Sequence, residues 1–150
     1  MVIAHRCHIL HVTENDTKSS LFLDIVKKTP SLLLERVTTA AEAIDVVLQR
    51  DRSNRPNLLL LDWELADGHA GAELLTTLKS DRTLRAVPVL VFANALPRIE
   101  VQRIYTMGAS CVVMPELSPD AFADAVELIC TFWGNIASLP YCDPAKPAIA

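Results

Sequence analysis

Two carboxylates stand at positions where they can do chemistry together. Asp62 directly follows the unbroken apolar run at residues 58–61, and Glu14 follows a second apolar segment at residues 8–12. Both segments predict strands of a parallel sheet, and side chains that follow neighbouring strands of such a sheet lie close together. Two like charges at that separation raise a pKa or bind a divalent cation such as Mg²⁺. A carboxylate can also attack phosphorus and form an acyl phosphate, provided that cations neutralise the phosphoryl charge.

The elements that position these residues follow from the alternation of apolar runs with helical periodicity. Strands are predicted at residues 8–12, 32–37, 58–61, 87–92 and 111–113. Apolar pairs four residues apart, such as Leu21 with Ile25, predict helices between the strands. The strongest apolar stripe belongs to the last helix and consists of Phe122, Val126, Ile129 and Trp133. Strand and helix in turn predict an α/β fold, a doubly wound, five-stranded parallel sheet in three layers.

Capping signals agree with these elements. Thr39-Ala40-Ala41-Glu42 is a capping box, and Ser118-Pro119-Asp120 places a cap, a first-turn proline and an acid at the start of the last helix. Gly134 is expected to end that helix. The prolines that follow predict a tail without a core of its own, so we expect one domain at residues 1–136 and a Pro-rich tail at 137–150.

Composition narrows the function classes. The chain has 150 residues, 51% of them hydrophobic, and a net charge of -4, which excludes intrinsic disorder and argues against a nucleic-acid partner. Its longest apolar runs fall far short of the roughly 18 residues that a membrane helix needs, so no membrane span is expected. The start has no basic segment before an apolar run, and the four cysteines are scattered; both features favour a cytoplasmic location with reduced thiols.

Four segments resemble the receiver domains of response regulators, the CheY-like family. The string LLLLDWELADGHAG resembles the phosphoacceptor segment, and ILHVTENDTKSS resembles the first strand with its acidic turn. VPVLVFANALPR and MGASCVVMPELSPDAF resemble the fourth and fifth strands and the last helix. The similarity spans nearly the whole chain and implies the strand order 2-1-3-4-5.

The resemblance also implies roles for particular residues. Asp62 falls on the phosphoacceptor position, and Mg²⁺ would be held by Glu14, Asp62 and the backbone carbonyl of Glu64. The phosphoryl donor would be a sensor histidine kinase or another phosphorelay protein. The chain would be a stand-alone signalling protein of a two-component system, not an enzyme, and would act through protein contacts.

Several positions depart from the family pattern. Thr13 replaces one acid of the metal-binding pair, Ala93 replaces the hydroxyl residue after the fourth strand, and Met114 replaces the lysine that precedes Pro115. Losing one preorganised donor typically slows a reaction by about 10²–10³, so we expect weakened or atypical phosphorylation-dependent switching. Met114 is expected to act as an apolar plug, and Asn94 as a helix cap rather than a phosphate ligand.

The last helix carries more apolar surface than one buried stripe needs. We expect a partner surface at Phe122, Val126, Leu128 and Phe132. The partner could be a second copy of the chain, in a homodimer through the last two helices. The alternative is that the tail covers this surface. Three other functions remain open: a flavodoxin-like protein that binds FMN at the same sheet edge, an interaction or dimerisation module independent of phosphorylation, and a phosphatase with Asp62 as nucleophile.

Overall fold

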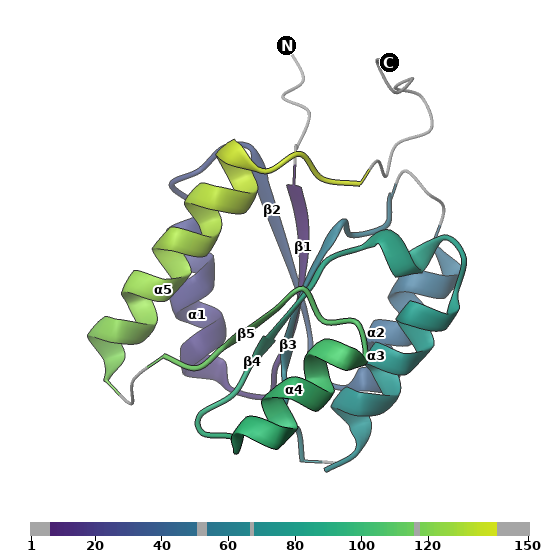
Figure 1. Cartoon of the computed structure of the whole chain (residues 1–150). Helices are drawn as coiled ribbons and strands as arrows, with labels where there is room; N and C mark the ends of the chain where they lie inside the picture. Colours follow the sequence, from purple (N-terminus) through teal and green to yellow (C-terminus); the bar gives the residue numbers. More distant parts are fainter. Residues whose placement is uncertain (1–6, 51–53, 67, 116–117, 141–150) are drawn as a thin grey trace.

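The computed structural model describes residues 7–50, 54–66, 68–115 and 118–140 (Figure 1). Strands and helices alternate along these residues. The strands are β1 (Cys7–Val12), β2 (Leu32–Val37), β3 (Leu58–Asp62), β4 (Val89–Phe92) and β5 (Cys111–Val113). The α-helices are α1 (Asp16–Val26), α2 (Ala40–Gln49), α3 (Ala70–Ser80), α4 (Arg98–Thr106) and α5 (Pro119–Thr131). A short 3-10 helix, η2 (Leu84–Ala86), precedes β4, and a π-helical turn, η3 (Phe132–Ile136), continues α5.

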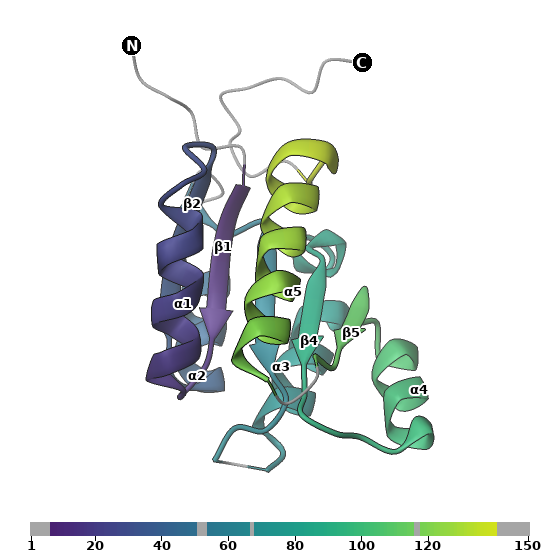
Figure 2. The same cartoon turned by 90° about the vertical axis from the view of Figure 1, so that its left-hand side faces the viewer.

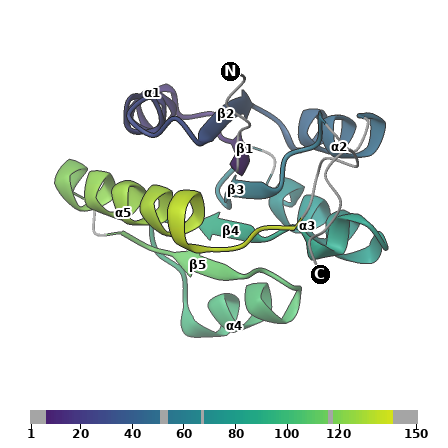
Figure 3. The same ribbon diagram turned by 90° about the horizontal axis from the view of Figure 1, so that it is seen from above.

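The strands form one parallel sheet in the order β2-β1-β3-β4-β5, so the predicted topology is confirmed. The order reverses at β1, because β2 lies on one side of it and β3 on the other. Parallel strands need crossover helices, and these cover both faces of the sheet. In Figure 3 α1 and α5 lie on one face, and α2, α3 and α4 lie on the other.

Alternation along the central strands explains both layers. Leu58 and Leu60 of β3 pack with Phe22 of α1, whereas Leu59 and Leu61 pack with α2 and α3. Burial on both faces is why this strand is an unbroken apolar run. Figure 2 turns the α1 and α5 face toward the viewer and shows both helices in front of the strands.

Side-chain caps fix where three helices begin. The Thr39 hydroxyl accepts the Glu42 N–H at the start of α2, and the Ser118 hydroxyl accepts the Ala121 N–H at the start of α5. At the start of α1, the side chain of Asn15 accepts the Lys18 N–H. The caps at Thr39 and Ser118 are confirmed, whereas the Glu42 carboxylate accepts the hydroxyls of Thr38 and Thr39 and not the backbone N–H that a capping box predicts.

Three sequence expectations need correction. The fourth strand begins at Val89 and not at residue 87, because Val87 caps η2, its N–H bonded to the Leu84 carbonyl, and Pro88 has no N–H to give to the sheet. Gly134 does not end the last helix; it lies inside the π-helical turn, where an added Cβ would be 2.9 Å from Cδ2 of Leu32. Val126 is fully buried between α5 and the sheet, so it cannot belong to a partner surface.

The segment after η3 returns to the sheet as far as the structure describes it. Leu139 packs against the core beneath α1 and α5, and the Pro140 carbonyl accepts a hydrogen bond from the Asn57 amide at 3.4 Å. Residues 141–150 of the expected tail lie outside the described residues. No helix in the described ranges is long and apolar enough to cross a membrane.

Candidate functional site

The two residues closest to the reversal of strand order face the same side of the sheet. Asp62 ends β3, and Thr13 follows β1 directly. Side chains alternate along a strand, so Asp62 points to the same face as Leu58 and Leu60, the face covered by α1 and α5. The site therefore lies at the carboxyl ends of β1 and β3, beneath the first turn of α1, where functional groups of doubly wound sheets gather.

Asp62 is buried and held by one direct hydrogen bond. The Thr13 hydroxyl donates to Oδ2 of Asp62 at 2.5 Å, and the Asn15 N–H donates to that hydroxyl at 3.1 Å. Nε of Arg36 donates to the Thr13 carbonyl at 3.2 Å, which fixes the loop from the other side. Only 8% of Asp62 is exposed, and its other oxygen, Oδ1, is buried without a hydrogen-bond partner among the described residues.

The surroundings disfavour the charged form of this carboxyl group. Burial raises the pKa of Asp62 above its usual range; the bond from Thr13 and the charges of Lys18 and Arg36 lower it in part, and the charge of Glu64 raises it. A carboxylate that is short of solvation gains from any cation or donor that reaches Oδ1. Asp62 is thus prepared to bind a positively charged or electrophilic group.

A cavity of about 300 Å³ opens in front of Asp62. Its lining mixes acids, amides and one amine: Glu14, Asn15, Lys18, Asp62, Glu64, Phe92 and Asn94. Glu14 accepts the Ala66 N–H at 3.2 Å, which ties the turn after β1 to the loop after β3. The cavity is large enough for a small anion with water and is open to solvent on one side.

Glu64 and Asn94 form a clamp across this opening. The Glu64 carboxylate accepts the Asn94 backbone N–H at 3.0 Å and its side-chain amide at 2.7 Å. The prediction that Asn94 caps the following helix is wrong, because α4 begins at Arg98 and has Pro97 in the cap position. The sequence predicted no role for the side chain of Glu64. The role predicted for its backbone carbonyl, as a metal ligand, stays a prediction.

The donor set fits a hard divalent cation held by few protein groups. Mg²⁺ is commonly bound by one or two carboxylates together with water and phosphate oxygens. Glu14 and Asp62 line the same cavity, and the buried Oδ1 of Asp62 is available. Within the described ranges, no three His, Cys, Asp or Glu side chains gather around one point; Thr13, which follows β1, contributes a hydroxyl and no carboxylate. A metal here would rely on water and phosphate for its other ligands.

The other departures lie around the rim. Ala93 is buried, and its backbone N–H donates to the Val113 carbonyl at 3.1 Å. Its side chain is a methyl group and cannot donate a hydrogen bond to the site. Pro115 lines a second cavity of about 260 Å³ beside the first. Met114 is 43% exposed and lines neither cavity. The prediction that Met114 plugs the site is therefore wrong: the side chain turns to solvent instead.

One residue of the site was missed from the sequence. Lys18 lies in the first turn of α1 and lines both cavities. It precedes Phe22 by four residues, and Phe22 is fully buried against the sheet. Residues four apart share a helix face, so this spacing was the signal that Lys18 points toward the sheet edge and not into solvent.

The proposed partner surface is only partly exposed. Leu128 and Phe132 are 71% and 47% exposed, and Ile136 extends the same apolar strip. Phe122 instead belongs to an aromatic cluster with Phe22 and Phe92, whose ring centroids lie 6.1 Å from its own. Phe122, in the first turn of α5, thus points toward the sheet and lines the second cavity, while the exposed strip lies toward the other end of the helix.

Comparisons with known proteins agree with the fold. The chain is 25% identical to the polar-differentiation response regulator DivK of Brucella anthropi over 119 residues, which are 79% of this chain and 92% of DivK. The solved structure of the Mn²⁺-bound response regulator Rcp1 has a TM-score of 0.82 at 25% identity and covers 89% of this chain and 99% of its own. The phosphorylated cyanobacterial phytochrome response regulator RcpA has a TM-score of 0.81 at 26% identity, with 90% and 99% covered. No protein-family model matches the chain.

Proposed function

We propose that this chain, which has the fold and the relatives of a CheY-like receiver domain, accepts a phosphoryl group on Asp62 and signals through protein contacts. The observation that carries the proposal is the state of Asp62. It is a buried carboxylate at the carboxyl end of β3, with one oxygen held by Thr13 and the other unpaired among the described residues, facing a polar cavity. Asp62 also lies at the phosphoacceptor position of the family.

The chemistry is a transfer from a phosphorylated donor. An oxygen of Asp62 bonds to phosphorus while the bond from phosphorus to the leaving group of the donor breaks, and the electron pair stays with that group. The hydroxyl of Thr13 holds the second carboxylate oxygen and orients the attacking one. Bound Mg²⁺, held by Glu14, Asp62 and the Glu64 carbonyl, would neutralise phosphoryl charge. The donor would be a sensor histidine kinase or another phosphorelay protein.

We expect this transfer to be slow. The hydroxyl that receivers offer after β4 is absent at Ala93, and the side chain of Met114 points to solvent. Each missing donor reduces the rate by about 10²–10³ if nothing replaces it. The protein is then a signalling module rather than an enzyme. Among the described residues Cys111 and Cys130 form no disulfide, which supports a reducing compartment, the cytoplasm.

The test uses a phosphoryl analogue and the tryptophan next to Asp62. The backbone N–H of Trp63 donates to the Phe92 carbonyl at 2.8 Å, and its ring lies against Gly71 in the first turn of α3, so its fluorescence reports on the loop that follows Asp62. A Trp133→Phe background removes the other tryptophan. Adding Mg²⁺ and beryllofluoride should give a saturable fluorescence change that Asp62→Asn abolishes, and calorimetry should give the same affinity. Equal binding by the Asp62→Asn variant, or no heat and no fluorescence change in the wild type, would overturn the proposal.

A second function is favoured by the exposed apolar strip of Leu128, Phe132 and Ile136. An interaction or dimerisation module that works without phosphate would use this surface permanently. Sedimentation with and without beryllofluoride separates the two functions, because only a phosphorylation-dependent switch changes its assembly state. An FMN-binding role fits the cavity poorly, since Glu14 and Asp62 would repel a phosphate held without metal; a colourless preparation after purification would reject it.

A further inference from the structure

We propose that Lys18 on α1 supplies the cation for the phosphoryl group, in place of the lysine that receiver domains carry where this chain has Met114. The inference rests on the proposed function of Asp62. In this arrangement the positive charge comes from α1, on the opposite wall of the cavity from β5. The chain would then have no lysine at the family position but would still present one positive charge to the phosphoryl group.

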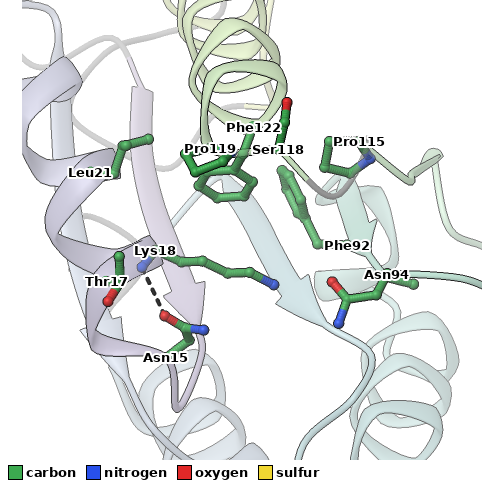
Figure 4. A pocket seen from close by; sticks show the side chains of 11 residues that line it. Asn15, Thr17, Lys18, Leu21, Phe92, Asn94, Pro115, Ser118, Pro119 and Phe122 are labelled. Carbon is green, nitrogen blue, oxygen red and sulfur yellow. Dashed lines mark hydrogen bonds between the residues drawn. The ribbon is translucent and has the colours of Figure 1, made fainter.

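The position of Lys18 follows from local structure. Asn15 caps α1 by accepting the Lys18 N–H at 2.9 Å, which sets the direction of the first turn. Phe22, four residues later, is buried against the sheet and anchors the same helix face. The side chain of Lys18 therefore starts at the wall of the site. Figure 4 shows it extended from α1 across the opening, with its amine toward Asn94.

Apolar contacts direct the long side chain. Nζ of Lys18 lies 5.7 Å from the ring centroid of Phe122, at a distance where an ammonium group is attracted to an aromatic face. Phe92 and Phe122 line the second cavity on which this side chain lies. The residue is partly buried, so its stem packs while its charged end stays at the boundary between the two cavities.

The charge of Lys18 acts on Asp62, and no salt bridge among the described residues pairs it with another acid. Among the cations that lower the pKa of Asp62, Lys18 has a larger effect than Arg36. Arg36 is committed elsewhere, because its Nη2 lies 2.8 Å from Oδ1 of Asp16. The salt bridges within the described residues do not include Lys18. Lys18 is thus not ion-paired with Glu14 or Glu64, which line the same cavity, and its ammonium group is available to an anion that enters there.

The experiment measures metal and anion affinity separately, with Trp63 fluorescence in the Trp133→Phe background. Mg²⁺ is titrated alone, and beryllofluoride is then titrated at saturating Mg²⁺. The variants are Lys18→Met, a second neutral variant Lys18→Gln, and the conservative Lys18→Arg. Lys28→Met is the matched control, since it removes the same charge from an exposed position beyond the other end of α1.

The neutral variants should bind beryllofluoride about tenfold more weakly or worse, the loss expected for one charge-assisted hydrogen bond. They should bind Mg²⁺ alone more tightly, because a neighbouring positive charge is gone. These opposite shifts separate a direct electrostatic role from partial unfolding, which would weaken both ligands. Lys18→Arg should stay within about threefold of wild type, and Lys28→Met should change neither affinity.

Two results would count against the inference in different ways. If the neutral Lys18 variants bind beryllofluoride as tightly as wild type, or if Lys28→Met weakens binding equally, Lys18 has no special role and the proposed function of Asp62 stands. If wild-type protein does not bind beryllofluoride at all, the proposed function itself fails. The wild-type titration thus separates failure of the site from failure of Lys18.

Discussion

Replacing Thr13 by valine tests how Asp62 is held. Valine keeps the branched shape of threonine and removes only the hydroxyl that donates to Oδ2 of Asp62 at 2.5 Å. A hydrogen bond to a charged group contributes about 1.5–3 kcal/mol, and the variant leaves a buried carboxylate with neither oxygen bonded among the described residues. We therefore expect Thr13→Val to lower the free energy of unfolding by about 2 kcal/mol at pH 7.

A double-mutant cycle with Asp62→Asn isolates the charge. Asp62→Asn alone should stabilise the protein by about 0.5–2 kcal/mol, since it removes a carboxylate whose pKa burial has raised. In that background Thr13→Val should cost only about 1 kcal/mol, because its partner is neutral. Urea unfolding of the four proteins gives the coupling energy, expected to be about 1 kcal/mol or more.

The pH dependence has a defined sign. A carboxyl group whose native pKa is raised binds its proton more tightly in the folded state, so protonation of Asp62 stabilises the fold as pH falls through that pKa. The deficit of Thr13→Val should shrink over the same range. Additive effects in the cycle, together with a deficit that does not change with pH, would refute a charged Asp62 held by Thr13.

Three further predictions concern other parts of the molecule. Burial, aided by Arg36 and Lys18, lowers the pKa of His11 to about 3 from 6.5, so unfolding takes up a proton and stability falls as pH drops below about 6.5. The loss should be about 2 kcal/mol at pH 5, and His11→Gln should remove this slope; equal slopes in urea unfolding would contradict it. Asn94→Asp places a carboxylate against Glu64, whose oxygen lies 2.7 Å from the native amide, and should lower the melting temperature by a few degrees. Adding Glu64→Gln removes the repulsion and should restore the melting temperature; a double variant that stays destabilised would disprove the clamp. Val126→Ala should cost about 2 kcal/mol in urea unfolding, whereas the exposed Leu128→Ala should cost under about 0.5 kcal/mol; equal effects would contradict their different burial.

The fold was largely predictable because its signals are local. The apolar run at residues 58–61 has the length and pattern of a strand covered on both faces. Thr39 and Ser118 mark their helix starts by chemistry that needs no tertiary context. Gly134 misled because glycine usually ends helices, whereas here it lets the π-helical turn approach Leu32. A contact between residues about a hundred positions apart leaves no local signal.

The site was predictable in its strand-end residues and not in its helical one. Asp62 ends β3, and Thr13 and Glu14 follow β1, so topology alone gathers them. The side chain of Lys18 reaches the site from a helix, and only the burial of Phe22 reveals its direction. Met114 was misplaced because a residue type does not say whether a side chain at a strand end turns inward or to solvent.

The most direct measurement is the rate at which a small phosphodonor modifies Asp62, followed by intact mass in the presence of Mg²⁺. The wild type should gain one phosphoryl group slowly, and Asp62→Asn should gain none. Ala93→Thr, which adds a hydroxyl to the wall of the second cavity, beside the one in front of Asp62, should accelerate the reaction by on the order of 10²-fold. A wild type that stays unmodified, or one that is modified rapidly and gains nothing from Ala93→Thr, would contradict a slow phosphoacceptor at Asp62.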